Sequence, residues 1–178
     1  METPSIVDIA LKADRLITDS RLQDFSFLLQ TSPVDRVKAI ASVINTLPPG
    51  GYLIGCGPYC CGIYPLSVDE IVLGRPITPL EKLPDAVADY TLNDAVWMLP
   101  REVSRIHASI LREQSQNGCE YFVRDENSQN GTYLNSRRIS VDEEGNPDKR
   151  PAPLASGDTI SLGPSRVNTY VFVQITEV

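Results

Sequence analysis

The second part of the chain consists of short apolar runs separated by turn-forming residues. Each run is only a few residues long and rich in β-branched or aromatic residues, and no long helical pattern stands between them. Many short strands at such spacing are typical of an antiparallel β-sandwich, so we predict a mainly β fold. The predicted strands are residues 52–54, 70–73, 95–99, 107–111, 120–123, 131–134, 159–162 and 170–175.

The last predicted strand alternates between two faces. Val171, Val173 and Ile175 lie on one face, and Tyr170, Phe172 and Gln174 lie on the other. This pattern predicts a half-buried strand. Residues 76–94 and 141–153 are irregular and punctuated by proline, so we expect both stretches on the surface.

The first fifty residues carry helical patterns with clear start and stop signals. Ser5 and Asp8 begin the first helix, and the run Ser32-Pro33-Val34-Asp35 begins another with a capping hydroxyl and a proline in the first turn. The Pro48-Pro49-Gly50-Gly51 run ends it. Between them we expect a second short helix, capped by Asp19 or Ser20, with Leu22, Phe25, Leu28 and Leu29 on its apolar face.

We therefore predict two parts, a helical extension over residues 1–50 and a sandwich over residues 51–178. The helices need a surface to cover because their faces are apolar. They either pack against the sandwich or form an interface through which two copies associate.

Charge and composition exclude several classes of protein. The 178-residue chain has a formal net charge of −7 and a pI near 4.7, which argues against a nucleic-acid partner. Residues 1–50 hold five basic and six acidic residues, so no basic recognition helix stands out. The uncharged stretch from Ala39 to Val68 is broken by prolines and glycines, so it predicts no membrane span. With no basic segment before an apolar run at the N-terminus, we expect a cytoplasmic protein.

Catalytic and metal chemistry has little support in the residues. His107 is the only histidine, so a nucleophile system or a histidine-type zinc site would depend on it alone. Cys56, Cys60 and Cys61 cluster and Cys119 lies apart, a spacing that suits zinc poorly. We expect free thiols, with a redox or metal role as the alternative, and we predict no enzyme, no cofactor and no metal.

Four small motifs follow one another along the predicted strands. They are Gly74-Arg75, then the run Ser104 to Ile110, then the run Asp125 to Asn135 with Asn130-Gly131-Thr132 inside it, and last the run Leu154 to Gly163. In order and chemistry they resemble the forkhead-associated (FHA) domain, a module that recognises phosphothreonine, over roughly residues 51–178. The resemblance implies a sandwich of about eleven strands.

The chemistry of two of these residues points to an anion independently. A phosphorylated threonine carries close to two negative charges and three acceptor oxygens, so its receptor must supply several donors held in place beforehand. Arg75 follows a predicted strand and offers a planar set of donors, and Ser104 offers a hydroxyl. Loops on a rigid scaffold hold such groups at low entropic cost.

The resemblance also implies roles for the neighbouring residues. Arg75 and Ser104 would contact the phosphate, Arg105 would add a cation, Gln129 would stand beside the ligand, and Asn130 would hydrogen-bond the peptide backbone. The supporting residues would be Gly74, His107, Gly131 and Thr132. Purely structural alternatives stay open for these residues: Arg75 as a surface arginine, Ser104 as a turn cap, and Asn130-Gly131 as a tight turn.

Two departures from the family pattern stand out. Ser136 follows Asn135 where the family usually places glycine, which implies a strained or wider turn. The segment from Arg75 to Ser104 is longer than usual, so it could select partners or obstruct them. Arg101, Arg105, Arg137 and Arg138 are expected near Arg75 as a positive patch, with scattered solvated charges as the alternative.

We therefore predict a non-enzymatic, phosphothreonine-dependent adaptor downstream of a serine/threonine kinase. One alternative is a docking domain that needs no phosphate. Another is a kinase-sensing regulator that acts through its N-terminal helices. Thr3 and Thr31 lie near predicted helix starts. A further, weaker hypothesis is that the domain binds one of these two threonines when it is phosphorylated.

Overall fold

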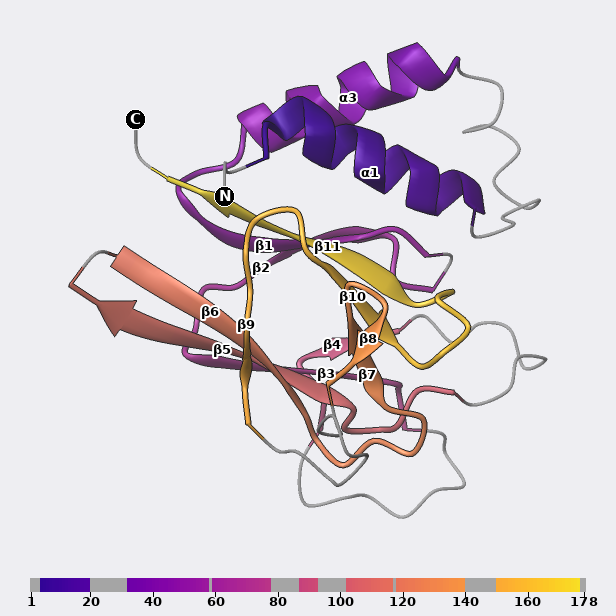
Figure 1. Cartoon of the computed structure of the whole chain (residues 1–178), viewed down its shortest axis with the longest axis vertical. Coiled ribbons are helices and arrows are strands. Elements are labelled where there is room, and N and C mark those ends of the chain that lie inside the picture. Colours follow the sequence, from indigo (N-terminus) through magenta and orange to yellow (C-terminus); the bar gives the residue numbers. More distant parts are fainter. Residues whose placement is uncertain are drawn as a thin grey trace.

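The structure, a computed structural model, places the strands in two facing sheets (Figure 1). It describes residues 4–19, 32–57, 59–77, 87–92, 102–116, 118–139 and 150–176. The strands of the first sheet are β1 (Gly50–Gly55), β2 (Gly62–Pro65), β7 (Thr132–Leu134), β8 (Arg137–Arg138), β10 (Thr159–Leu162) and β11 (Thr169–Ile175). Those of the second are β3 (Glu70–Gly74), β4 (Tyr90–Thr91), β5 (Ala108–Ser115), β6 (Gly118–Asp125) and β9 (Ala152–Pro153).

The order of strands is β2-β1-β11-β10-β7-β8 in the first sheet and β4-β3-β5-β6-β9 in the second. Neighbouring strands are antiparallel except for β3 and β4, which pair in parallel through Leu73 and Gly74. The fold prediction of a mainly β sandwich with a helical N-terminal segment is confirmed. The strand predicted at 95–99 lies outside the described residues.

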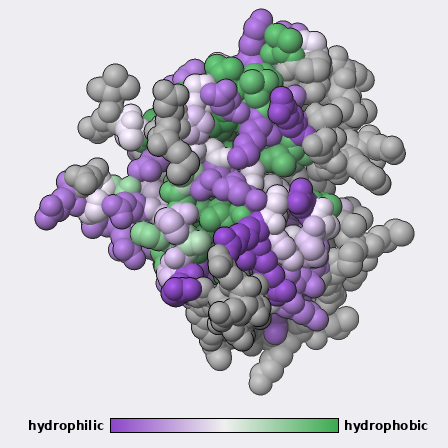
Figure 2. All heavy atoms as spheres, in the orientation of Figure 1, coloured by the Kyte–Doolittle hydropathy of each residue, from purple (hydrophilic) through white to green (hydrophobic). Residues whose placement is uncertain are grey.

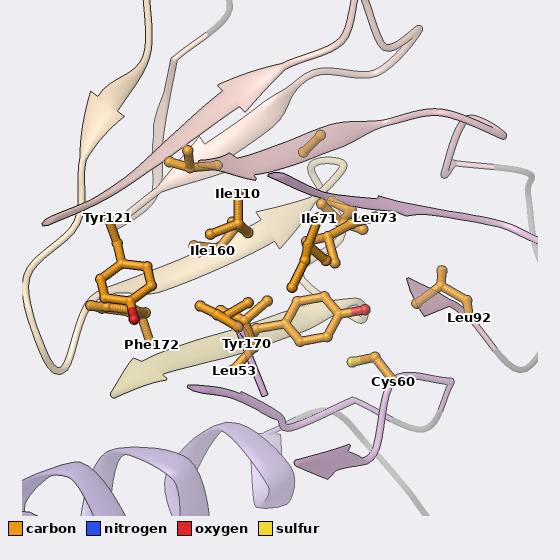
Figure 3. Close-up of a cluster of buried hydrophobic side chains, with 14 of the residues drawn as sticks. Leu53, Cys60, Ile71, Leu73, Leu92, Ile110, Tyr121, Ile160, Tyr170 and Phe172 are labelled. Carbon is orange, nitrogen blue, oxygen red and sulfur yellow. The ribbon is translucent and has the colours of Figure 1, made fainter. Parts of the chain in front are cut away.

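The main core lies between the two sheets (Figure 3). Tyr170 and Phe172 project from β11 into this core, where Phe172 packs on Tyr121 with ring centroids 5.2 Å apart. Ile110 and Ile160 approach from opposite sheets, and both are buried. Burying one such side chain stabilises the fold by roughly 1.5–3 kcal/mol.

Two helices cover the outer face of the first sheet, at the top of Figure 1: α1 (Ile6–Asp19) and α3 (Pro33–Asn45). Their start signals work as predicted. The Ser5 hydroxyl accepts the Asp8 N–H at 3.2 Å, and the Ser32 hydroxyl accepts the Asp35 N–H at 3.2 Å. The short helix expected to carry Leu22, Phe25, Leu28 and Leu29 lies outside the described residues.

A second core lies between the helices and the first sheet. Ile9 of α1 and Ile44 of α3 pack there against Ile54 of β1 and against Val171 and Val173 of β11. The prediction that β11 is half-buried is therefore wrong: both of its faces are covered, one by the facing sheet and one by the helices. Alternation alone cannot show whether a helix covers the second face of a strand.

Some apolar side chains of the helices face outward. Figure 2 shows apolar residues at the surface over the helices, and Val7, Leu11, Val34 and Val43 are exposed. In the described part of the chain, neither helix is long and apolar enough to cross a bilayer. Self-association through this surface and the domain division at residue 50 stay predictions.

Candidate functional site

Arg75 and Ser104 lie side by side on two loops. Arg75 directly follows β3, and its main-chain N–H donates a 3.1 Å hydrogen bond to the carbonyl of Ser104. The Arg75 side chain is partly buried, and its Nη1 donates to the carbonyl of Pro76 at 3.0 Å. The two loops are thus joined at the very residues predicted to hold an anion.

Gly74 explains how the two loops come so close. A Cβ atom at this position would lie 1.9 Å from the carbonyl oxygen of Arg105, a separation that no side chain tolerates. Glycine therefore lets the end of β3 press against the Ser104-Arg105 segment. Arg105 itself is exposed at this junction.

His107 ties the Ser104 loop to the next loop from beneath. Its Nδ1 accepts the main-chain N–H of Ser104 at 3.0 Å, and so its Nε2 carries the proton and donates to the carbonyl of Gly131 at 3.2 Å. The ring is fully buried, and this burial lowers the pKa of His107 below its usual 6.5. A neutral imidazole is what the two hydrogen bonds require.

The loop that follows β6 is held by Asp125. Its carboxylate accepts the Ser128 hydroxyl at 2.6 Å and the Thr132 hydroxyl at 2.7 Å, and Thr132 is fully buried. The Ser128 hydroxyl in turn accepts the main-chain N–H of Gly131 at 2.9 Å. Gly131 has φ +83°, which favours glycine, so the loop turns sharply here.

Gln129 and Asn130 stand on this loop next to Ser104. The main-chain N–H of Gln129 donates to the Ser104 hydroxyl at 3.1 Å, and the Gln129 side chain is exposed. The Asn130 side chain donates through Nδ2 to the carbonyl of Glu102 at 2.8 Å. All five residues predicted to contact a ligand therefore come from three neighbouring loops.

Arg138 joins the same surface from β8. A Cβ atom on Gly131 would lie 2.3 Å from Nε of Arg138, so the guanidinium rests directly against Gly131. Arg137 is exposed on the same short strand. Arg75 and Arg105 lie at the junction of the first two loops and Arg138 lies against the third, whereas Arg101 lies outside the described residues, so the positive patch stays a prediction.

A model of the FHA domain family matches residues 71–163, just over half of the chain and all of the loops described above. The chain belongs to the FHA family. The matched segment begins in β3 and ends just after β10, so it also covers five strands of the second sheet.

One curated protein and several solved structures are similar to this FHA domain. The germ layers disorganized protein gldi-3 of Caenorhabditis elegans is 39% identical over 89 residues, covering 46% of this chain and 8% of that protein. The chain therefore spans only a small part of its relative's length. The yeast splicing factor Pml1, part of the RES complex, matches with a TM-score of 0.52 at 20% identity, over 76% of this chain and 89% of Pml1.

A solved MEK1 FHA domain matches with a TM-score of 0.50 at 17% identity, over 75% of this chain and 97% of that domain. At such low identity, the likeness to these two structures concerns the fold alone. It agrees with the two-sheet arrangement in Figure 1.

Sequence reasoning missed two residues that organise this FHA loop surface. Ser128 lies three residues after Asp125, and that spacing is typical of a local side-chain turn, so a signal was present. Glu102 holds Asn130 through its main-chain carbonyl, a contact that any residue type could make. No local pattern could have identified Glu102.

The four cysteines of the FHA domain are free thiols and lie away from these loops in sequence. Cys56 and Cys60 are buried, and burial raises the pKa of both thiols, that of Cys60 to about 12. They therefore stay protonated at neutral pH, unlike reactive thiolates. Within the described ranges, no cluster of three His, Cys, Asp or Glu side chains could hold a metal ion.

Proposed function

We propose that this FHA domain binds protein segments that carry a phosphorylated threonine, with Arg75 and Ser104 holding the phosphate. The observation that carries the proposal is the 3.1 Å main-chain hydrogen bond between Arg75 and Ser104. It keeps a guanidinium-bearing loop and a hydroxyl-bearing loop together before any ligand arrives. Donors held in advance bind a dianion without a large ordering cost.

The neighbouring residues complete the proposed site. Gln129 and Arg105 flank the phosphate, and Asn130 bonds the backbone of the peptide. The supporting residues in this proposal are Gly74, His107, Gly131 and Thr132. The contacts of the first three join the loops to one another, and Thr132 holds the loop between β6 and β7 through Asp125. No bond of the ligand is made or broken in this role, so the proposal is a binding module rather than an enzyme.

At the level of the cell, we propose an adaptor that reads the output of a serine/threonine kinase in the cytoplasm. Family membership supports the binding part of this role. The chain covers only 8% of gldi-3, so the partner and the kinase are part of this proposal alone. Affinity capture from cells with and without phosphatase treatment would test this part separately.

The direct test is a phosphothreonine-peptide library screened with the wild type beside Arg75→Ala and Ser104→Ala. We expect enrichment of phosphorylated over unphosphorylated peptides, and a loss of affinity of about tenfold or more in each variant, because each removes a charge-assisted hydrogen bond. Arg15→Ala removes the same charge from an exposed position on α1 and should leave affinity unchanged.

A wild type that does not discriminate phosphorylated from unphosphorylated peptides would contradict the proposal. It would favour the alternative of a docking domain that needs no phosphate. Circular dichroism of each variant would check that the sandwich is still folded.

A further inference from the structure

Glu102 contacts two loops, one through its main chain and the other through its side chain. Its main-chain carbonyl accepts the Asn130 side-chain amide at 2.8 Å. Its carboxylate accepts the main-chain N–H of Ser165 through Oε1 at 2.8 Å and the Ser165 hydroxyl through Oε2. Ser165 belongs to the loop between β10 and β11, which carries none of the residues predicted to bind the ligand.

The fit between these loops depends on Gly163. Gly163 has φ +92°, and a Cβ atom there would lie 2.2 Å from Cγ of Glu102, so the Glu102 stem rests on the bare glycine backbone. The N–H of Gly163 also donates to the carbonyl of Gly131 at 3.0 Å, next to Asn130. Glu102 is therefore fixed by packing on one side and by two hydrogen bonds on the other.

We propose that Glu102 and Ser165 form a clamp that positions Asn130 for the peptide backbone. This inference rests on the proposed function. An amide side chain has two N–H donors and one carbonyl acceptor. The Glu102 carbonyl engages one N–H, which orients the second N–H and the carbonyl oxygen as the pair that a peptide backbone requires.

The clamp acts through charge as well as shape. A carboxylate that accepts a main-chain N–H and a hydroxyl together makes charge-assisted hydrogen bonds, which are stronger than neutral ones. Glu102 is half-buried and Ser165 is exposed. A negative group placed on Ser165 would repel the Glu102 carboxylate and release it, so this loop could change the affinity of the site without touching the ligand.

A double-mutant cycle tests whether Glu102 acts through Asn130. We expect Glu102→Ala and Asn130→Ala each to weaken binding of the best phosphopeptide about five- to tenfold, and the double variant to be no weaker than Asn130→Ala alone. Equal losses from Glu102→Ala in both backgrounds would overturn the inference. Glu113→Ala, which removes the same charge from exposed β5, is the matched control and should bind normally.

Variants of Ser165 test the other half of the clamp. We expect the order of affinity to be wild type, then Ser165→Ala, then Ser165→Asp, because the first variant removes a donor and the second adds repulsion. Wild-type affinity in Ser165→Asp would overturn the role of Ser165.

NMR of the ligand-free protein separates this inference from the proposed function. The side-chain amide signals of Asn130 should shift in Glu102→Ala and in Ser165→Asp and stay unchanged in Glu113→Ala. Shifted signals in a protein that binds no phosphopeptide would refute the proposed function and leave the clamp standing. Unshifted signals in a protein that binds phosphopeptide would refute the clamp alone.

Discussion

Gly74 leaves room for the carbonyl of Arg105, and Gly131 leaves room for the side chain of Arg138. Added Cβ atoms would lie 1.9 Å and 2.3 Å from these groups. The main-chain contact excludes any side chain at Gly74, and φ +83° favours glycine at Gly131, although neither residue needs to contact a ligand. Arg75 depends on Gly74 because the end of β3 could not otherwise approach the Ser104-Arg105 segment.

The turn between β7 and β8 holds two residues other than glycine in the left-handed region. Asn135 has φ 49° and Ser136 has φ 72°, and the hairpin register leaves only these two residues in the turn. Of the two outcomes that the sequence implied for Ser136, the turn is narrow and strained. Asn135 compensates by accepting the main-chain N–H of Thr159 and donating to Asp158.

Replacing Ser136 with glycine should relieve this strain. We expect Ser136→Gly to raise the free energy of unfolding by about 1 kcal/mol, because a left-handed conformation costs about that much for a residue with a Cβ. Urea denaturation would measure it. Ser136→Ala keeps the Cβ and should give no such gain, so an equal gain from alanine would contradict the explanation.

His107 makes stability depend on pH. Burial lowers its pKa below 6.5, whereas the unfolded chain keeps the usual value. Above pH 6.5 both forms are neutral and stability is highest. As the pH falls below 6.5, the imidazole of His107 becomes protonated in the unfolded chain but stays neutral in the folded one. The free energy of unfolding therefore falls by at most about 1.4 kcal/mol per pH unit.

Urea midpoints at pH 7.5 and 5.5 would measure this dependence, with His107→Gln as the comparison that should lose it. An unchanged pH dependence in that variant would assign the effect to other groups. Because His107 is the only histidine, NMR of its imidazole also gives the folded pKa directly.

The residues of the candidate site could be found from sequence because their types are rare in combination. A local signal marks each of them: an arginine after a glycine at a strand end, a serine three residues before a buried histidine, and Asn130-Gly131 in a turn. Glu102 lacks one, because its contacts depend on which loops meet in three dimensions.

At the level of elements, β11 connects the two cores. Tyr170 and Phe172 fill the space between the sheets, and Val171 and Val173 face the helices. Long apolar strands and capped helices could be predicted from their periodicity. The strands β4, β8 and β9 could not, because each has only two residues and so shows no periodic pattern. The burial of the outer face of β11 could not be predicted either, because it depends on the helices α1 and α3, which are distant in the sequence.

Ile44 tests how strongly α3 is attached to the sheet. Its side chain is 1% exposed, so Ile44→Ala should lower the free energy of unfolding by about 2–4 kcal/mol through lost packing. Its neighbour Val43 is 47% exposed, and Val43→Ala should cost less than about 0.5 kcal/mol. Similar costs for the two variants in thermal or urea unfolding would show that α3 does not pack as described.

Across the whole molecule, charge is distributed unevenly. The net charge is −7, yet Arg75, Arg105 and Arg138 lie on or against the three loops of the candidate site. Acidic residues such as Asp8, Asp35 and Glu113 are exposed on the helices and on β5. In a chain with an excess of acidic residues, we expect a dianion to depend on these local arginines rather than on the overall charge.

The pairing of β1 with β11 has a consequence for how the chain is made. Gly50 pairs with Ile175 and Gly55 with Tyr170, so one neighbour of β1 is the last strand of the sandwich, whereas its other neighbour, β2, follows it directly. A ribosome releases the helices, β1 and β2 long before β11 exists. Until then the apolar sides of α1 and α3 lack their contacts with Val171 and Val173, so they stay partly exposed and offer a chaperone a place to bind.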